Sequence, residues 1–111
     1  MPIRMKVRRR EALAVCFVLL VSPSLGADPR VHEIGIDNLA FGLAPHGLHV
    51  NDVVEWTNSD ILRHTATATD GSFDVDLPAG GKGRTILMRA GNVTYVCRFH
   101  PGMQGRLEVA P

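Results

Sequence analysis

The sequence has few cysteines, no hydrophobic run long enough to cross a membrane and almost no excess of charge. Only Cys16 and Cys97 occur among its 111 residues. The apolar run ALAVCFVLLV, at residues 12–21, is too short for a bilayer, which needs about 20 apolar residues. The formal net charge is +1, and residues 28–111 contain no basic patch that would favour nucleic acid. We therefore expect neither a membrane-spanning protein nor a nucleic-acid-binding one.

Helical periodicity and repetition are also missing. No stretch keeps a helical pattern of apolar residues over three turns, and Pro45, Pro78 and Pro101 interrupt the candidates. No internal repeat, linker or low-complexity tract is present. These absences exclude a helical bundle and a repeat protein, and the length allows one domain.

The N-terminal segment differs in kind from the rest of the chain. Basic residues at positions 4–10 precede the apolar run, and the small residues of SPSLGA follow it. This order is typical of a secretory signal peptide. The sequence therefore predicts a signal peptide at residues 1–27 and one domain at residues 28–111, located in the periplasm or otherwise exported.

Removal of the signal peptide would change the cysteine content and the net charge of the protein. We place the cleavage after Ala27, with Gly26 as the alternative. Cys16 would leave with the signal, so the exported domain would keep Cys97 alone and could form no internal disulfide. Oxidising compartments pair or oxidise free thiols, so a lone exported thiol needs an explanation. Five of the 12 basic residues and one of the 11 acidic residues would also leave, which makes the remainder slightly acidic, near −3.

The remaining sequence consists of short β-rich runs separated by turn residues. β-Branched and aromatic residues cluster between Gly, Asn, Asp and Pro, which predicts an all-β sandwich or barrel. We expect Trp56 in the core because it shares one strand face with Val54, and Met88 because it alternates within TILMR. The expected strands lie at residues 31–36, 48–50, 52–58, 63–69, 83–89, 92–97 and 105–109.

One stretch, YVCRFHPGM at residues 95–103, carries three metal-binding side chains at three-residue intervals. Cys97 ends an expected strand, His100 lies in the following turn and Met103 enters the next strand. A bent loop of this size can point all three side chains at one spot. A thiolate, an imidazole and a weak thioether together suit a soft metal, copper above all.

A blue-copper site needs a second imidazole, which must come from elsewhere in the chain. His64 stands at the start of an expected strand after a polar turn, where a loop site would find a fourth ligand. His46 and His49 lie in a turn that enters a strand, and we interpret them as solvated. The candidates are His32, His46, His49 and His64.

In their order, these segments resemble the small blue-copper cupredoxins, and within them the amicyanin-like and plastocyanin-like proteins. The resemblance covers nearly all of residues 31–109, through NLAFGLAPHGLHVNDVVEWTNSD, RHTATATDGSFDVDLPAGGKG and GNVTYVCRFHPGMQGRLEV. The Cys-x2-His-x2-Met spacing is similar to the short ligand loop of amicyanin. The resemblance implies a Greek-key β-sandwich that binds one copper ion, Cu(I) or Cu(II), through equatorial His64, Cys97 and His100 and axial Met103.

Two positions depart from the family pattern. Many relatives have Asn after the upstream histidine, and its side chain ties the two ligand loops together; here the residue is Thr65. The residue after the cysteine is often Ser or Thr, and here it is Arg98. We therefore expect an altered tie between the loops, which bears on redox tuning more than on copper binding.

The function implied by the resemblance is periplasmic one-electron transfer by a monomer that is not an enzyme. Its partners would be redox proteins, such as a dehydrogenase, a cytochrome or an oxidase, that dock transiently near an exposed His100. Phe99 and Pro101 would surround that imidazole, with Phe41 and Pro45 as further candidates. A copper carrier that uses the same ligands is the alternative. A thiol enzyme would need a third group to orient Cys97 and His100, and none is evident.

Overall fold

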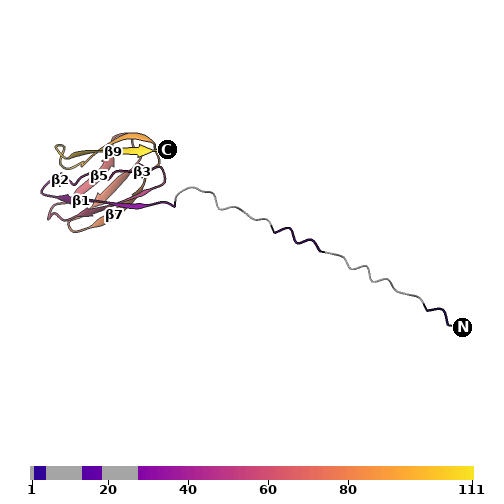
Figure 1. Cartoon of the computed structure of the whole chain (residues 1–111). Coiled ribbons are helices and arrows are strands. Elements are labelled where there is room, and N and C mark those ends of the chain that lie inside the picture. Colours follow the sequence, from indigo (N-terminus) through magenta and orange to yellow (C-terminus); the bar gives the residue numbers. More distant parts are fainter. Residues whose placement is uncertain (1, 5–13, 19–27) are drawn as a thin grey trace.

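Residues 31–110 form a sandwich of two β-sheets (Figure 1). This computed structural model describes residues 2–4, 14–18 and 28–111. Most of the predicted signal peptide and its cleavage position at Ala27 or Gly26 lie outside the described residues. Within the described ranges, no helix has the length and apolar character needed to cross a membrane. The all-β sandwich predicted from the sequence is confirmed.

The first sheet has the strand order β2-β1-β4-β7. β1 pairs in parallel with β4, whereas β1 with β2 and β4 with β7 are antiparallel. Its strands alternate between buried and exposed side chains, as expected when one face covers the core and the other meets solvent. They are β1 (Val31–Asp37), β2 (Ala40–Phe41), β4 (Val53–Asn58) and β7 (Lys82–Ile86).

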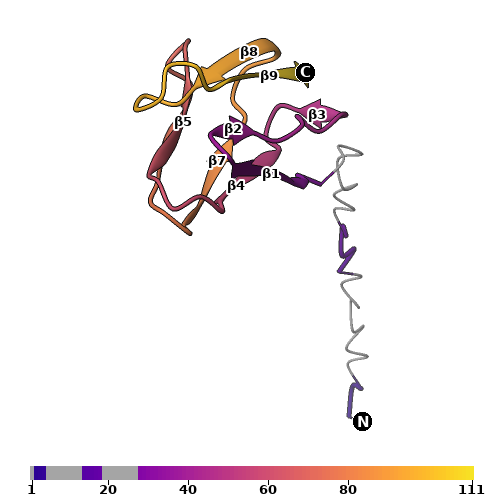
Figure 2. The ribbon, with the colours of Figure 1, turned by 90° about the vertical axis from the view of Figure 1, so that its left-hand side faces the viewer.

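The second sheet has the strand order β3-β9-β8-β5-β6. All of its pairs are antiparallel except the short parallel contact between β3 and β9. Figure 2 shows β8 and β9 next to each other, with β5 in the same layer. The strands are β3 (Leu48–His49), β5 (His64–Ala68), β6 (Asp74–Leu77), β8 (Gly91–Val96) and β9 (Gln104–Ala110).

An aromatic cluster fills the space between the sheets. Trp56 is completely buried, which confirms its predicted core position, and its ring centroid lies 5.0 Å from that of Tyr95. Phe41 packs edge-on against Tyr95 at 4.8 Å, and Phe73 lies 5.8 Å from Trp56. The Tyr95 ring also covers Gly105, whose missing Cβ leaves room for it. The core therefore joins β2, β4, β8 and β9 directly behind the end of β8.

The predicted core position of Met88 is wrong, because the alternation has the opposite phase. Thr85 and Leu87 point inward, whereas the side chain of Met88 is 70% exposed. A polar residue takes the inner position because the Thr85 hydroxyl accepts a hydrogen bond from Trp56 Nε1 at 3.2 Å. Trp56, the partner that allows Thr85 to be buried, lies 29 positions away, so no pattern close to Thr85 in the sequence reveals it.

Antiparallel pairing brings three strand ends together at one end of the second sheet, namely the start of β5, the end of β8 and the start of β9. His64 begins β5, Cys97 follows β8 directly, and Met103 directly precedes β9. Since β5 and β9 both run antiparallel to β8, the starts of β5 and β9 lie beside the end of β8. The loop from Cys97 to Met103 therefore closes over the start of β5.

Candidate metal centre

Three of the predicted ligands lie close together in space, although His64 is more than 30 positions from Cys97 and His100 in the sequence. The side chains of His64, Cys97 and His100 bring their ligand atoms within 4.8 Å of one another. The two Nδ1 atoms are 3.2 Å apart. Cys97 Sγ lies 3.7 Å from His64 Nδ1 and 3.5 Å from His100 Nδ1. His64 and Cys97 are buried, and His100 is half-buried.

These spacings fit a small metal ion placed between the three atoms. Zinc provides the scale, with bonds of about 2.0–2.1 Å to nitrogen and about 2.3 Å to sulfur. At tetrahedral angles such bonds place two nitrogens about 3.3 Å apart and nitrogen about 3.6 Å from sulfur. The observed distances of 3.2, 3.5 and 3.7 Å agree with that spacing. Two imidazoles and a thiolate, with a thioether nearby, are the donors that blue-copper sites use.

The environment of Cys97 favours its thiolate. Burial alone would raise the pKa of this thiol, because it disfavours the charged form. The backbone N–H of Thr65, and then the neighbouring His100 and His64 rings, outweigh burial, and the pKa falls to about 6. Since the thiolate is the form that binds metal, the protein presents a ready ligand near neutral pH.

Asp60 holds His64 from the side opposite to the cluster. Its Oδ2 lies 2.7 Å from His64 Nε2 and accepts that ring N–H. The N–H groups of Asn38 and Leu39 also donate to this carboxylate, at 2.8 and 3.0 Å. The backbone donor from Leu39 first, and then the His64 ring, keep the pKa of Asp60 below its ordinary value. With its proton on Nε2, His64 turns the Nδ1 lone pair toward the cluster.

A buried asparagine shapes the loop that carries Asp60. The Asn58 side chain is 1% exposed, and its amide nitrogen donates to the carbonyls of Leu62, Leu77 and Pro78 at 2.8–3.2 Å. Its carbonyl oxygen accepts the N–H of Asp60 at 2.9 Å. Asn58 therefore fixes the turn before His64 and ties it to the end of β6. Sequence reasoning assigned no role to Asn58 or Asp60, although both lie in the WTNSD segment.

Met103 is placed by the backbone of the ligand loop. Its N–H donates to the His100 carbonyl at 2.9 Å, and its own carbonyl accepts the N–H of Cys97 at 3.2 Å. The side chain is 3% exposed and belongs to the core cluster together with Cys97. The loop is thus closed by its own backbone groups, and the thioether is kept on the buried side of the loop.

The two ligand loops are tied together through the side chain of Thr65. Thr65 Oγ1 accepts the backbone N–H of Arg98 at 2.9 Å, and the N–H of Thr65 lies 3.4 Å from Cys97 Sγ. The hydroxyl oxygen therefore takes the part expected of an asparagine side chain. The sequence could not show this, because a hydroxyl reaches the partner loop only if the backbones approach closely.

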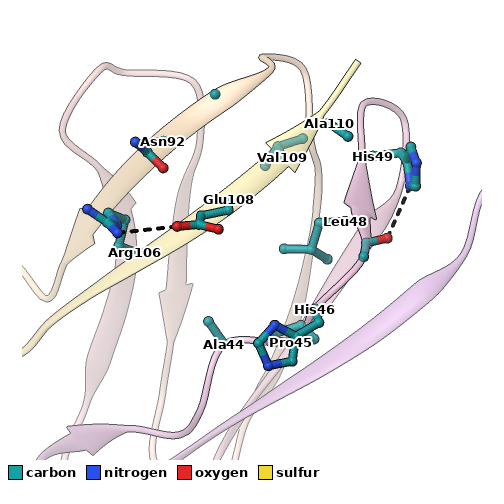
Figure 3. A pocket seen from close by; sticks show the side chains of 12 residues that line it. Ala44, Pro45, His46, Leu48, His49, Asn92, Arg106, Glu108, Val109 and Ala110 are labelled. Carbon is teal, nitrogen blue, oxygen red and sulfur yellow. Dashed lines mark hydrogen bonds and ion pairs between the residues drawn. The ribbon is translucent and has the colours of Figure 1, made fainter.

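The remaining histidine candidates lie away from this cluster. His32 Nε2 is 3.0 Å from Asp52 Oδ2, near the start of β1. His46 and His49 line an open pocket beside Asn92, Glu108 and Val109 (Figure 3). That pocket lies where β8 begins and β9 ends, whereas the cluster lies where β8 ends and β9 begins. Both of these rings are exposed, as predicted.

Two of the four residues expected around His100 lie elsewhere. Phe41 packs in the aromatic core, and Pro45 lines the distant pocket with His46. Phe99, 48% exposed, and Pro101 remain beside His100 in the ligand loop. The expectation for Phe41 and Pro45 was wrong because the short β2 directs Phe41 inward and the chain then runs to β3.

Solved structures of amicyanin share this architecture. The Cu(I) form of a methionine-to-alanine variant has a TM-score of 0.61 and 21% identity, covering 77% of this chain and 86% of that chain. An oxidised methionine-to-leucine variant has a TM-score of 0.60 and 19% identity, covering 69% and 79%. The fold is that of the cupredoxins. In this fold, His64, Cys97 and His100 come together at the loop end where β8 ends and β9 begins.

Comparisons at the level of sequence add little to the cupredoxin fold. No protein-family model matches the chain. A phosphoglucosamine mutase of Aromatoleum aromaticum is 31% identical over 85 residues, which cover 69% of this chain and 18% of that protein. The chain therefore spans less than a fifth of the length of this relative, and the mutase activity is a property of that protein.

Proposed function

We propose that the chain is a type 1 copper protein that carries single electrons between redox partners. His64, Cys97 and His100 would hold one copper ion as equatorial ligands, and Met103 would be the axial ligand. The observation that carries the proposal is the cluster of two imidazole nitrogens and one thiol sulfur within 4.8 Å at the loop end of a cupredoxin fold. Bound copper would supply a one-electron couple between Cu(I) and Cu(II).

The residues around the cluster support electron transfer rather than copper delivery. His64 is fully enclosed and fixed by Asp60, and the tie between Thr65 and Arg98 joins the two ligand loops. The geometry of a site held in this way changes little between Cu(I) and Cu(II), and such a site releases its ion slowly. A copper carrier, by contrast, must release its ion. Coordination of Cys97 would also protect an exported lone thiol from oxidation.

The colour and the redox behaviour of the Cu(II) protein test the proposal. We expect an intense blue from thiolate-to-copper charge transfer, a reversible one-electron couple, and slow loss of copper to a strong Cu(I) chelator. A colourless Cu(II) complex would remove the type 1 assignment. Fast release to the chelator without a reversible couple would instead favour the carrier function.

Partner docking is proposed at the exposed part of the ligand loop, near His100. Phe99 is 48% exposed, and the guanidinium groups of Arg63 and Arg98 lie 5.3 and 5.8 Å from its ring centroid. Exposed apolar groups suit weak and transient contacts of small area. Phe99→Ala should slow electron self-exchange between two copies without moving the reduction potential, whereas Met88→Ala, an exposed control far from the loop, should change neither.

Export is proposed from the N-terminal sequence alone. A signal peptide at residues 1–27 would send the domain at residues 28–111 to the periplasm as a monomer. Mass spectrometry of protein recovered from the periplasmic fraction of a producing bacterium would give the new N-terminus. We expect it at Asp28, or at Ala27 if cleavage follows Gly26; recovery of the uncut chain from the cytoplasm would contradict the proposal.

A further inference from the structure

A chain of hydrogen bonds leads from the ligand loop to the surface strand β6. The backbone N–H of Arg98, the residue after Cys97, donates to Thr65 Oγ1 at 2.9 Å. Thr65 Oγ1 lies 2.9 Å from Thr67 Oγ1, and the Thr67 hydroxyl donates to Asp74 Oδ1 at 2.7 Å. Arg98 Nε lies 3.3 Å from the same Asp74 oxygen. The contacts thus form a closed circuit that begins and ends on Arg98.

Strand geometry builds this circuit. Thr65 and Thr67 are two positions apart on β5, so their side chains lie on the same face of the sheet. Thr67 pairs directly with Asp74 across the antiparallel β5–β6 ladder. Thr65 is completely buried, Thr67 is half-buried and Asp74 is exposed, so the circuit runs from the protein interior to solvent.

The anionic end fixes the direction of every hydrogen bond in the circuit. An ionised carboxylate only accepts, so the single proton of the Thr67 hydroxyl is committed to Asp74. Thr67 Oγ1 can then serve Thr65 only as an acceptor, which commits the Thr65 proton to Thr67 in turn. The lone pairs of Thr65 Oγ1 are left for the N–H of Arg98. Without Thr67 or Asp74, the Thr65 hydroxyl has no fixed orientation.

We propose that Thr67 and Asp74 are positioning residues of the metal centre, which hold the peptide after Cys97 by orienting the Thr65 hydroxyl. The proposal rests on the proposed copper function for its purpose, but every contact of the circuit is between protein atoms. Thr65 acts on both sides of Cys97, because its N–H faces Sγ at 3.4 Å while its hydroxyl binds the next peptide. Loosening this hydroxyl therefore frees the segment that carries the thiolate.

Amide hydrogen exchange of Arg98 in the metal-free protein measures the circuit directly. Thr67→Val keeps the shape of the side chain but removes the hydroxyl, and Asp74→Ala removes the acceptor. Each should speed Arg98 exchange by about fivefold or more, as expected for weakening one hydrogen bond. The double variant should exchange no faster than the faster single variant, because both substitutions break the same chain.

Two further variants control for other effects. Thr67→Ser keeps the hydroxyl and should restore the slow exchange of Arg98. Asp76→Ala removes the same charge from the same strand, but Asp76 pairs with Arg63 instead, so it should leave Arg98 exchange unchanged. Unchanged exchange in both Thr67→Val and Asp74→Ala would overturn the proposal, as would an equal effect of Asp76→Ala and Asp74→Ala.

Copper loading then separates this proposal from the proposed function. In a blue Cu(II) protein, Thr67→Val should shift the thiolate-to-copper absorption and the reduction potential, and Thr67→Ser should leave both near the wild-type values. If the protein is blue but Thr67→Val leaves its absorption and reduction potential unchanged, the positioning role is refuted and the copper function stands. A wild-type protein that is not blue would refute the function, and the Arg98 exchange rates would still decide whether the circuit holds the loop.

Discussion

The His64 and His100 rings meet edge-on with their Nδ1 atoms 3.2 Å apart, although 36 positions separate them in the sequence. Asp60 accepts the Nε2 proton of His64, so His64 presents a lone pair to its neighbour. His64 Nδ1, His100 Nδ1 and Cys97 Sγ thus lie at the spacing that one small cation between them would bridge.

Replacement of Cys97 by serine tests the thiolate directly. Cys97→Ser should abolish the blue colour and greatly weaken copper binding, because the hydroxyl stays protonated and is a poor soft donor. Visible absorption and a copper titration check this, with circular dichroism of the metal-free variant as the control for folding. A variant that stays blue would mean that Cys97 is not the ligand.

Substitutions of Met103 separate ligation from packing. Met103→Gln should keep a copper site but lower the reduction potential, because the harder amide oxygen favours Cu(II). Met103→Leu keeps an apolar side chain of similar volume without a donor, so the potential should rise. Voltammetry of the two variants beside the wild type gives both shifts. If neither variant moves the potential, Met103 is a packing residue only.

Asp60→Asn probes the carboxylate behind His64. The carboxylate makes the His64 ring a stronger donor and adds negative charge, and both effects stabilise Cu(II) over Cu(I). The neutral amide should therefore raise the reduction potential, while its oxygen can still accept from the His64 ring. Asp70→Asn, on a turn outside the site, is the matched loss of charge and should leave the potential unchanged. Equal shifts of the reduction potential in the two variants would mean that Asp60 acts only through its long-range charge.

Asp52 should make the stability of the metal-free protein depend on pH. Burial disfavours its charge, but the N–H of Arg30, the His32 ring and the N–H of His49 outweigh burial and hold its pKa below the ordinary value. A lowered pKa gives stability that is present above the ordinary Asp value of about 3.9 and is lost as pH falls through the folded-state pKa.

Asp52→Asn should therefore cost about 1–3 kcal/mol of unfolding free energy near neutral pH, as expected for disturbed buried hydrogen bonds. The gap to the wild type should stay constant from neutral pH to about 5 and shrink below about 4. Urea unfolding at a series of pH values gives the gap. A gap that keeps its size in acid would show that the charge of Asp52 is not the cause.

The contact between Tyr95 and Gly105 should make position 105 intolerant of any side chain. A Cβ at Gly105 would lie 2.2 Å from the Tyr95 ring, whereas one at Gly35 would meet nothing within 4 Å. Gly105→Ala should thus lower the unfolding free energy by about 1–3 kcal/mol through overpacking, and Gly35→Ala should change it little. Thermal unfolding of both metal-free variants provides the comparison. Similar midpoints for the two would mean that the Tyr95 ring moves aside without cost.

The ligand loop was predictable because Cys97, His100 and Met103 are close in sequence. His64 was one of four candidate histidines at the level of the residues, and the resemblance to the cupredoxins selected it. The anchoring role of Asp60 could not, because it depends on the Asn38–Leu39 turn folding against a loop more than 20 positions away. The ligand roles themselves stay predictions.

The limits for the fold have similar causes. The structure adds β2 and β6 to the predicted strands. β6 reads DVDL, and aspartate is depleted in strands, so local composition conceals it. Charged residues are nevertheless ordinary on an edge strand, where they discourage pairing with other chains. The phase of Met88 was misjudged because Thr85 is satisfied by a distant tryptophan. Local pattern thus finds the strands, and pairing decides which face and which neighbours they have.

The positions of the proposed ligands along the chain also determine the order in which the nascent protein presents them during synthesis. Cys97, His100 and Met103 come after every strand from β1 to β8, and His64 precedes them by more than 30 positions. A chain made from its N-terminus therefore exposes His64 long before it can offer a thiolate. Until then, the nascent chain offers metal ions only imidazoles, from His32, His46, His49 and His64. The proposed site is complete only after eight of the nine strands have been made, so the copper that it would bind could be taken up only by a nearly finished molecule.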